Sequence, residues 1–180
     1  CLSHFIRLLE VPGVTLYSLQ KGERAADLNQ FPDVPIIDLG PAIQDFADTA
    51  AVLRGELDTS ANPPLDLVIT VDTSMAHLAG SMGIPCWVVL GQAYDWRWLR
   101  DRTDSPWYPT VRLFHQDSLD QVPLTQKSER YQSRWDTVFD RMIQTLQDLM
   151  NGGELEIPGK TPLKAPLKAP RREGSVVPAP

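Results

Sequence analysis

The segment 65–80 (LDLVITVDTSMAHLAG) holds the residues best suited to chemistry. Its apolar run predicts a strand that ends at Asp72, and a helix is expected to begin at once with Thr73 or Ser74 as its N-cap. The first turn of such a helix presents backbone N–H groups and the positive end of the helix dipole. Because Thr73, Ser74 and His77 can share one face of this turn, the pattern indicates a phosphate or diphosphate site.

The same turn also has a purely structural interpretation. Asp72 and Thr73 can cap the helix, while His77 can be a partly buried histidine with satisfied ring nitrogens. The spacing is compatible with both interpretations.

A second candidate lies in the segment SLQKG, where a strand is expected to end near Ser18. Lys21 would stand at the carboxyl end of that strand, and Gly22 permits a tight turn into the next helix. Ligands bind outside the carboxyl ends of strands in open α/β sheets, so Lys21 would direct a point charge toward the same crevice. A lysine at this place can equally be a solvated surface residue.

Aromatic residues are unusually dense after the apolar run that ends at Leu90. The segments 95–98 (DWRW) and 105–109 (SPWYP) place Trp96, Trp98 and Trp107 close together. This density is typical of a ligand wall or an interface, and it is equally typical of a loop clamped onto its own domain.

Around these candidates, strand-like and helix-like segments alternate. Continuous apolar runs predict strands that are buried on both faces, at Val14–Leu19, Pro35–Leu39, Leu65–Val71, Cys86–Leu90 and Val111–Phe114. Helical patterns lie between and after them, at Leu2–Glu10, Glu23–Asn29, Asp45–Leu53, Ser74–Met82 and Gln132–Met150, with Gly152–Gly153 as the final stop signal. Strands that alternate with helices predict an α/β domain with a Rossmann-like parallel sheet and flanking helices.

Composition divides the 180 residues into two parts. Residues 1–150 form the expected domain, with 12 Lys+Arg against 20 Asp+Glu, whereas residues 151–180 carry 5 against 3 and six of the sixteen prolines. So much proline and so little apolar surface predict a disordered tail. The acidic body argues against nucleic-acid binding, and the segment Arg54–Pro64 is expected to be an exposed loop.

The sequence lacks the motifs that several common kinds of enzyme and binding site require. The chain holds no Asp-x-Asp, no Gly-x-Gly-x-x-Gly after a strand, no P-loop and no Gly-x-Ser-x-Gly. Three scattered histidines, with Cys1 and Cys86, predict neither a metal site nor a disulfide framework. No run approaches the ~20 apolar residues of a transmembrane helix, and no signal peptide is recognised, so a cytoplasmic location is expected.

An ordered series of motifs resembles a known family: SLQKG, DFADTAAVL, LDLVITVDTSMAHLAGSMGIPCWVVL, DWRW, SPWYP and RLF. The chain is similar over residues 1–145 to bacterial tetratricopeptide-repeat proteins that end in a domain related to glycosyltransferase family 9, the heptosyltransferases. The resemblance implies the carboxy-terminal, donor-binding half of a GT-B fold. It also implies inverting sugar transfer without metal or cofactor, from a nucleotide sugar to a glycan, a lipid-linked sugar or a protein.

The resemblance also implies roles for particular residues. Those expected at the donor diphosphate are Lys21, Asp72, Thr73, Ser74 and His77. A weaker group is expected near the donor sugar, namely Gly91, Asp95, Trp96 and Arg97. The catalytic base would come from an amino-terminal Rossmann or tetratricopeptide region, so this chain is expected to be inactive by itself.

The chain departs from the family pattern at several places. Ser74 stands where heptosyltransferases usually have glycine, and the segment Arg54–Pro64 is longer than the pattern implies. The resemblance also leads us to expect that the first strand of the domain is missing from this sequence, which opens on the expected first helix. A sheet edge left unpaired in this way predicts aggregation or self-pairing. The alternative function is a non-catalytic scaffold with the Trp-rich loop as its contact surface, and a GT-B-fold epimerase is a lesser possibility.

Overall fold

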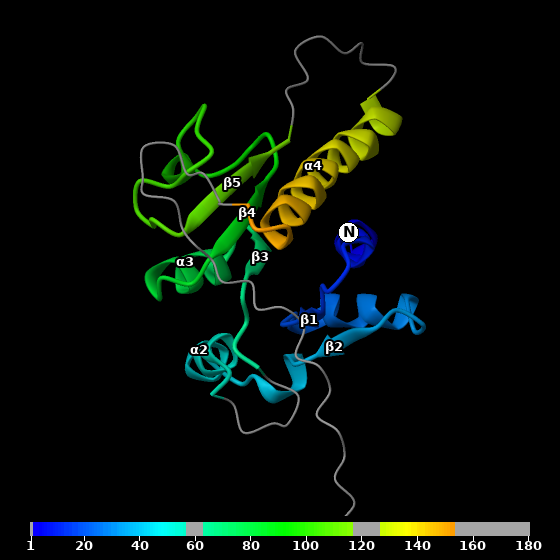
Figure 1. The fold of residues 1–180 in the computed structure, drawn as a ribbon, viewed down its shortest axis with the longest axis vertical. Helices are drawn as coiled ribbons and strands as arrows, with labels where there is room; N and C mark the ends of the chain where they lie inside the picture. Colours follow the sequence, from blue (N-terminus) through cyan, green and yellow to red (C-terminus); the bar gives the residue numbers. More distant parts are fainter. Residues whose placement is uncertain (1, 57–62, 117–126, 154–180) are drawn as a thin grey trace, which may run out of the picture.

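The computed structural model describes residues 2–56, 63–116 and 127–153, and it is a Rossmann-like α/β fold. Parallel strands form a central layer, with α2 (Phe46–Arg54) and α3 (Ser74–Ser81) on one side (Figure 1). On the other side lie α1 (Leu2–Ile6) and α4 (Lys127–Met150), which contact each other. The predicted fold class is therefore confirmed, while all but the first three residues of the predicted tail at 151–180 lie outside the described residues.

All five predicted strands are present, but they form two sheets. The first pairs β1 (Leu16–Ser18) with β2 (Ile36–Asp38), and the second has the order β3 (Val68–Val71), β4 (Cys86–Leu90) and β5 (Val111–His115). Every pairing between these five strands is parallel, as the alternating pattern predicts. In the described part of the chain, β1 and β3 are each paired on one side only.

The helices also follow the predicted ranges, with two differences in type. The segment Leu2–Glu10 divides into α1 and the 3₁₀ helix η1 (Arg7–Glu10), and the predicted helix at 23–29 is the 3₁₀ helix η2 (Gly22–Gln30). Short 3₁₀ turns occur at η3 (Gly40–Ala42) and η4 (Trp96–Trp98). The helix α4 ends as predicted, because Gly152 adopts a left-handed φ of 87° and the next amide, that of Gly153, donates to the Asp148 carbonyl.

Burial differs among the strands more than their composition suggests. Every residue of β4 is buried, whereas β1 is half-buried and β2 is half-buried up to the exposed Asp38. β3 ends at Val71, which has 47% of its surface exposed. The expectation that all strands are buried on both faces is therefore met only at β4. One core cluster joins α4 to η1, β4 and β5, and Leu16, Leu67 and Ile69 pack against it.

The helix α4 is joined to η1 by ion pairs and to α1 by apolar contacts. Arg7 pairs with Asp136 and Asp140 of α4, and Phe5 packs edge-on against Phe139 with ring centroids 5.0 Å apart. Within the described ranges, no helix has the length and apolar character needed to cross a membrane.

Candidate functional site

The helix α3 begins without a side-chain cap. Thr73 has the extended backbone of an N-cap residue, with φ −142° and ψ 173°, but its side chain accepts no hydrogen bond from the first turn. Its hydroxyl lies instead 3.1 Å from the Thr70 hydroxyl and 3.4 Å from the Val71 carbonyl. The structure thus places Thr73 at the predicted N-cap position, while the positive end of the α3 dipole lacks the usual acceptor from this side chain.

The helix α2 shows the opposite arrangement. The carboxylate of Asp45 accepts hydrogen bonds from the amides of Ala47 and Asp48, at 2.7 and 3.0 Å. Asp48 in turn accepts a bond from the Gln44 amide at 2.8 Å, which completes a reciprocal cap. The first turn of α2 is therefore occupied by the protein's own carboxylates.

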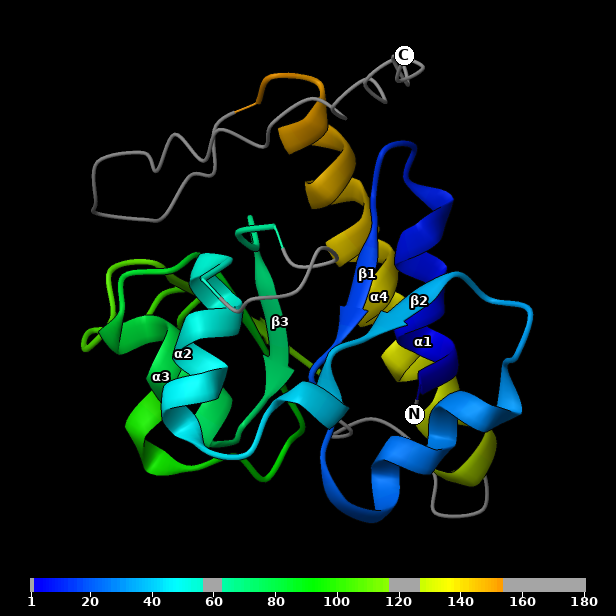
Figure 2. The ribbon, with the colours of Figure 1, turned by 90° about the horizontal axis from the view of Figure 1, so that it is seen from below.

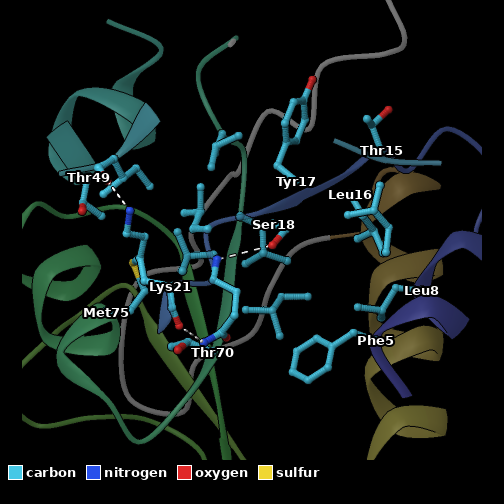
Figure 3. Close-up of a pocket in the computed structure, with 18 of the residues that line it drawn as sticks. Phe5, Leu8, Thr15, Leu16, Tyr17, Ser18, Lys21, Thr49, Thr70 and Met75 are labelled. Atoms are coloured by element: carbon cyan, nitrogen blue, oxygen red, sulfur yellow. Dashed lines mark hydrogen bonds between the residues drawn. The ribbon is translucent and has the colours of Figure 1, made fainter. Parts of the chain in front are cut away.

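A cavity of about 1550 Å³ opens beside the start of α3. Thr70, Thr73, Ser74 and Lys21 are among the residues that line it, and Figure 3 shows Lys21 between Met75 and Thr70. The ammonium group of Lys21 donates to the carbonyls of Ile43 and Gly40, at 2.6 and 3.1 Å. Because an ammonium group has three donors, these bonds fix its position and leave one further donor for a ligand.

The structure separates His77 from this cavity. Its Nδ1 lies 3.0 Å from the Tyr108 hydroxyl, and its ring stacks on the fully buried Trp98 with centroids 5.3 Å apart. Gly80 makes this arrangement possible, since a Cβ there would lie only 2.5 Å from the Tyr108 ring. His77 is thus half-buried among aromatic rings, and it is not among the cavity-lining residues that include Thr73 and Ser74.

Asp72 belongs to a second cluster, together with the weaker candidates of the loop after β4. Its carboxylate accepts a bond from the Asp95 amide at 3.3 Å. Asp95 caps η4 through the Arg97 amide at 2.9 Å and pairs with the Arg97 guanidinium at 2.7 Å. That guanidinium lies 5.6 Å from the centre of the exposed Trp96 ring. Gly91 is half-buried and would meet Trp135 only at an ordinary 3.9 Å if it carried a Cβ.

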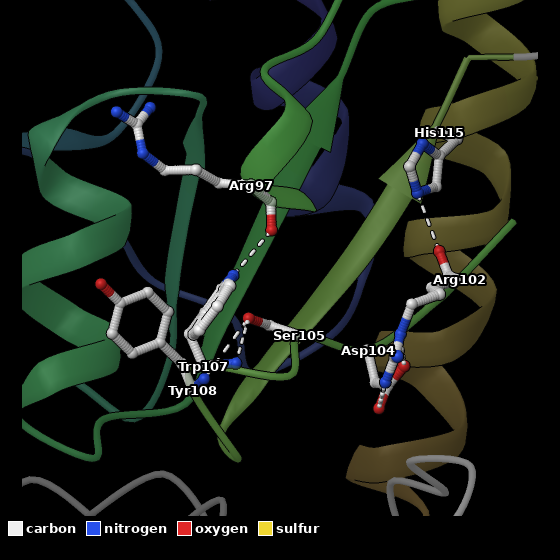
Figure 4. A network of polar contacts seen from close by, with 7 residues as sticks. All are labelled: Arg97, Arg102, Asp104, Ser105, Trp107, Tyr108 and His115. Carbon is white, nitrogen blue, oxygen red and sulfur yellow. Dashed lines mark hydrogen bonds and ion pairs between the residues drawn. The ribbon is translucent and has the colours of Figure 1, made fainter. Parts of the chain in front are cut away.

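Polar contacts hold the two aromatic segments to each other (Figure 4), and Tyr108 contacts His77 of α3. The Ser105 hydroxyl accepts bonds from the amides of Trp107 and Tyr108, at 3.2 and 3.3 Å. The indole N–H of Trp107 donates to the Arg97 carbonyl at 2.8 Å. This geometry agrees with the clamped-loop interpretation, although 57% of the Trp107 surface is still exposed.

Two side chains of the strands β4 and β5, Cys86 and His115, have shifted pKa values. Burial lowers the pKa of His115, whose Nε2 donates to the Arg102 carbonyl at 2.8 Å. Burial also raises the pKa of Cys86 to about 12, which keeps this β4 thiol protonated and unreactive. Neither side chain lines the cavity.

Sequence analysis missed two features of the site. Thr70 bonds to Thr73 and lines the cavity, and its signal was a polar residue inside an apolar strand, one before the last. The partnership of Tyr108 with His77 had no sequence signal, because the two residues are 31 positions apart. No group of three metal-ligating side chains occurs in the ranges that the structure describes.

The fold is that of a Rossmann-like α/β domain, and its candidate site lies at the uncapped start of α3. The chain is similar to protein FlbA of Caulobacter vibrioides, with 30% identity over 110 residues, which is 59% of this chain and 17% of that protein. It therefore spans well under a quarter of the length of this relative. No family model matches the chain, and no solved structure matches it.

Proposed function

We propose that this chain binds the diphosphate of a nucleotide sugar between the start of α3 and Lys21. It would be the donor-binding part of an inverting, metal-independent glycosyltransferase related to family 9, working in the cytoplasm. An acceptor hydroxyl, on a glycan, a lipid-linked sugar or a protein, would attack the anomeric carbon. The bond from that carbon to the diphosphate oxygen would break, and the hydroxyl proton would pass to a base in an amino-terminal Rossmann or tetratricopeptide region.

The uncapped first turn of α3 is the observation that carries this proposal. An anionic ligand placed there would be stabilised by the helix dipole and by the hydroxyls of Thr73 and Ser74. The Lys21 ammonium, which lines the same cavity and is fixed by two carbonyls, would supply positive charge without a metal. Asp72, His77 and the loop residues Gly91, Asp95, Trp96 and Arg97 would shape the surroundings rather than line this cavity.

The test is a calorimetric titration of the full chain with UDP, GDP, ADP and their sugar conjugates, without metal. One nucleotide should bind saturably. The variant Thr73→Asp would give α3 the carboxylate cap that Asp45 gives α2, so it should preserve or raise the melting temperature. The same carboxylate would occupy the anion position, and nucleotide affinity should fall about 10- to 100-fold.

Thr103→Asp is the matched control, because Thr103 is exposed and lies outside the cavity. This variant adds the same charge and should leave nucleotide affinity unchanged. Absence of binding by a chain that melts cooperatively would contradict the proposal. Equal affinity losses in both Asp variants would also contradict it, because the effect would then come from net charge.

The alternative function is a non-catalytic interaction module. It is favoured by one observation, the exposure of Trp96 and Trp107, at 70% and 57%, on a loop that polar contacts hold rigidly. Under this alternative, Trp96→Ser with Trp107→Ser would abolish partner binding by a chain that binds no nucleotide. Under the glycosyltransferase proposal, the double variant should retain nucleotide binding.

A further inference from the structure

The two sheets turn unpaired edges toward the same space. β1 has β2 as its neighbour and β3 has β4, so the other edge of each strand is free within the described residues. In Figure 1 the strands stand in one row, with β3 and β1 next to each other across the break. The cavity beside α3 continues through this break, since residues along the whole of β1 and β3 line it. We call this part of the cavity the slot.

The backbone of both strands is directed into the slot. The Ser18 carbonyl accepts a bond from the Leu39 amide at 2.9 Å on the β2 side, so the alternation along a strand directs the Tyr17 N–H and C=O the other way. The Val68 amide donates to the Pro85 carbonyl at 2.9 Å on the β4 side, so the groups of Ile69 face the slot. Two rows of donors and acceptors therefore face each other, as they would across a missing strand.

Apolar side chains line the slot on both faces of the sheet, together with polar residues such as Lys21 and Thr70. Phe5, Leu8 and Leu16 line it on the side of α1 and α4 (Figure 3). Met75 lies on the opposite side. The volume of about 1550 Å³ exceeds the 300–1,000 Å³ that is usual for small-molecule pockets. An occupant must thus satisfy backbone edges on two sides and apolar surfaces on the other two.

We propose that the slot receives one extended apolar strand that runs parallel to both β1 and β3. A helix, a lipid chain or a detergent would leave both rows of backbone groups unpaired, whereas a strand pairs with both. Because apolar side chains are present on both faces, the strand is a continuous run of residues such as Val and Ile. The inference is independent of nucleotide binding, because the strand fills the sheet rather than the α3 turn.

The start of α1 fixes where this strand ends. Leu2 lines the cavity, and the arrowheads of β1 and β3 point toward the end of the molecule at which α1 begins (Figure 2). A parallel strand in the slot therefore has its carboxyl end beside Leu2, as in the strand–helix connections of parallel sheets. This short distance makes a tethered strand a practical probe.

The experiment extends the full chain before residue 1 with a copy of residues 84–91 carrying Cys86→Ala, joined by a short Gly-Ser linker. Tethering gives an effective concentration in the millimolar range. The melting temperature should rise by about 5 °C, and amide exchange at Tyr17 and Ile69 should slow at least tenfold. Val88, inside the complete part of the sheet, is the internal control and should exchange as before. A tether with alternate residues replaced by lysine should have no effect.

A free peptide of the same sequence separates slot filling from addition to a single edge. In the slot, alternate N–H groups of the peptide face β1 and β3. N-methylation of the set that faces β1, or of the set that faces β3, should therefore abolish the slow amide exchange at both Tyr17 and Ile69. Sensitivity to one set alone would overturn the proposal, and so would an unprotected Tyr17 in a folded, tethered chain. Slow amide exchange at Tyr17 and Ile69 in the untethered chain would also overturn the proposal in two cases. If the slow exchange depends on protein concentration, the occupant is a second copy of the chain. If it is lost on deletion of residues 154–180, the occupant is that segment.

Discussion

β4 and β1 are both short apolar strands of parallel sheets, yet their environments differ. β4 has a neighbour on each side, and its residues Trp87 and Val88 have no exposed surface. β1 has a neighbour on one side only, and all three of its residues are half-buried. The comparison teaches that a strand's burial is determined by its neighbours in the sheet as much as by its own residues.

Truncating one leucine in each strand should give the largest effect. Leu90→Ala in β4 removes a side chain that is 1% exposed, and it should lower the free energy of unfolding by about 2–5 kcal/mol. Leu16→Ala in β1 should cost only about 1 kcal/mol, because its side chain borders the slot. Urea unfolding of both variants measures the difference. Equal losses would show that β1 is as well packed as β4.

The variants Leu16→Ala and Leu90→Ala can also be compared in the chain that carries the tethered strand, again by the loss in free energy of unfolding. Filling the slot buries Leu16 further, so Leu16→Ala should become more costly in the tethered chain than in the untethered one. The cost of Leu90→Ala should not change, since β4 already has both neighbours. Costs that are unchanged for both leucines would indicate that the strand lies elsewhere.

Packing over the complete part of the sheet can be tested at a glycine. Gly80→Ala places a Cβ about 2.5 Å from the Tyr108 ring, which should lower stability by about 1–3 kcal/mol and disturb the contact with His77. Gly91→Ala is the control, because its Cβ would meet Trp135 at 3.9 Å, and it should change stability by less than about 0.5 kcal/mol. A neutral Gly80→Ala would mean that Tyr108 can move away freely.

The smallest expected effect is on the pH dependence of stability, through His115 in β5 and His4 in α1. Burial lowers the pKa of His115 in β5 and that of His4 in α1, although Asp136 partly offsets the shift at His4. The unfolded chain therefore binds protons below about pH 6.5 that the folded chain does not bind, and stability should fall as the pH drops through this range. His115→Gln and His4→Gln should each make that decline shallower in urea titrations between pH 5 and 7.5. An unchanged slope in both variants would contradict the assignment.

Much of the fold was predictable because it depends on local patterns. The apolar runs located all five strands, and Gly152–Gly153 located the end of α4. The interruption between β1 and β3 was not readable from those runs themselves. Leu65–Val71 is as apolar as a central strand, and nothing in its composition reports that one of its edges lacks a partner.

The candidate site was predictable in part for a similar reason. Thr73 and Ser74 follow a strand directly, so local sequence places them at the start of a helix. Whether Thr73 uses its hydroxyl as a cap depends on rotamer choice, and it bonds to Thr70 instead. The orientation of His77 depends on Tyr108, which arrives from a distant loop and packs over Gly80. Contacts of this kind between distant segments leave no periodic signal in the sequence.

The long helix α4 has a consequence for motion. Its residues Met142 and Leu146 belong to the core that contains Val89 of β4, and Leu16 of β1 packs against that same core. In the described residues, no backbone hydrogen bond joins β1 to β3, so side chains rather than a ladder hold the two parts of the sheet together. The separation of the two parts can therefore widen and narrow about α4 without breaking a ladder bond. Such a hinge motion of the two parts of the sheet belongs to the microsecond-to-millisecond range, where relaxation-dispersion NMR would detect it.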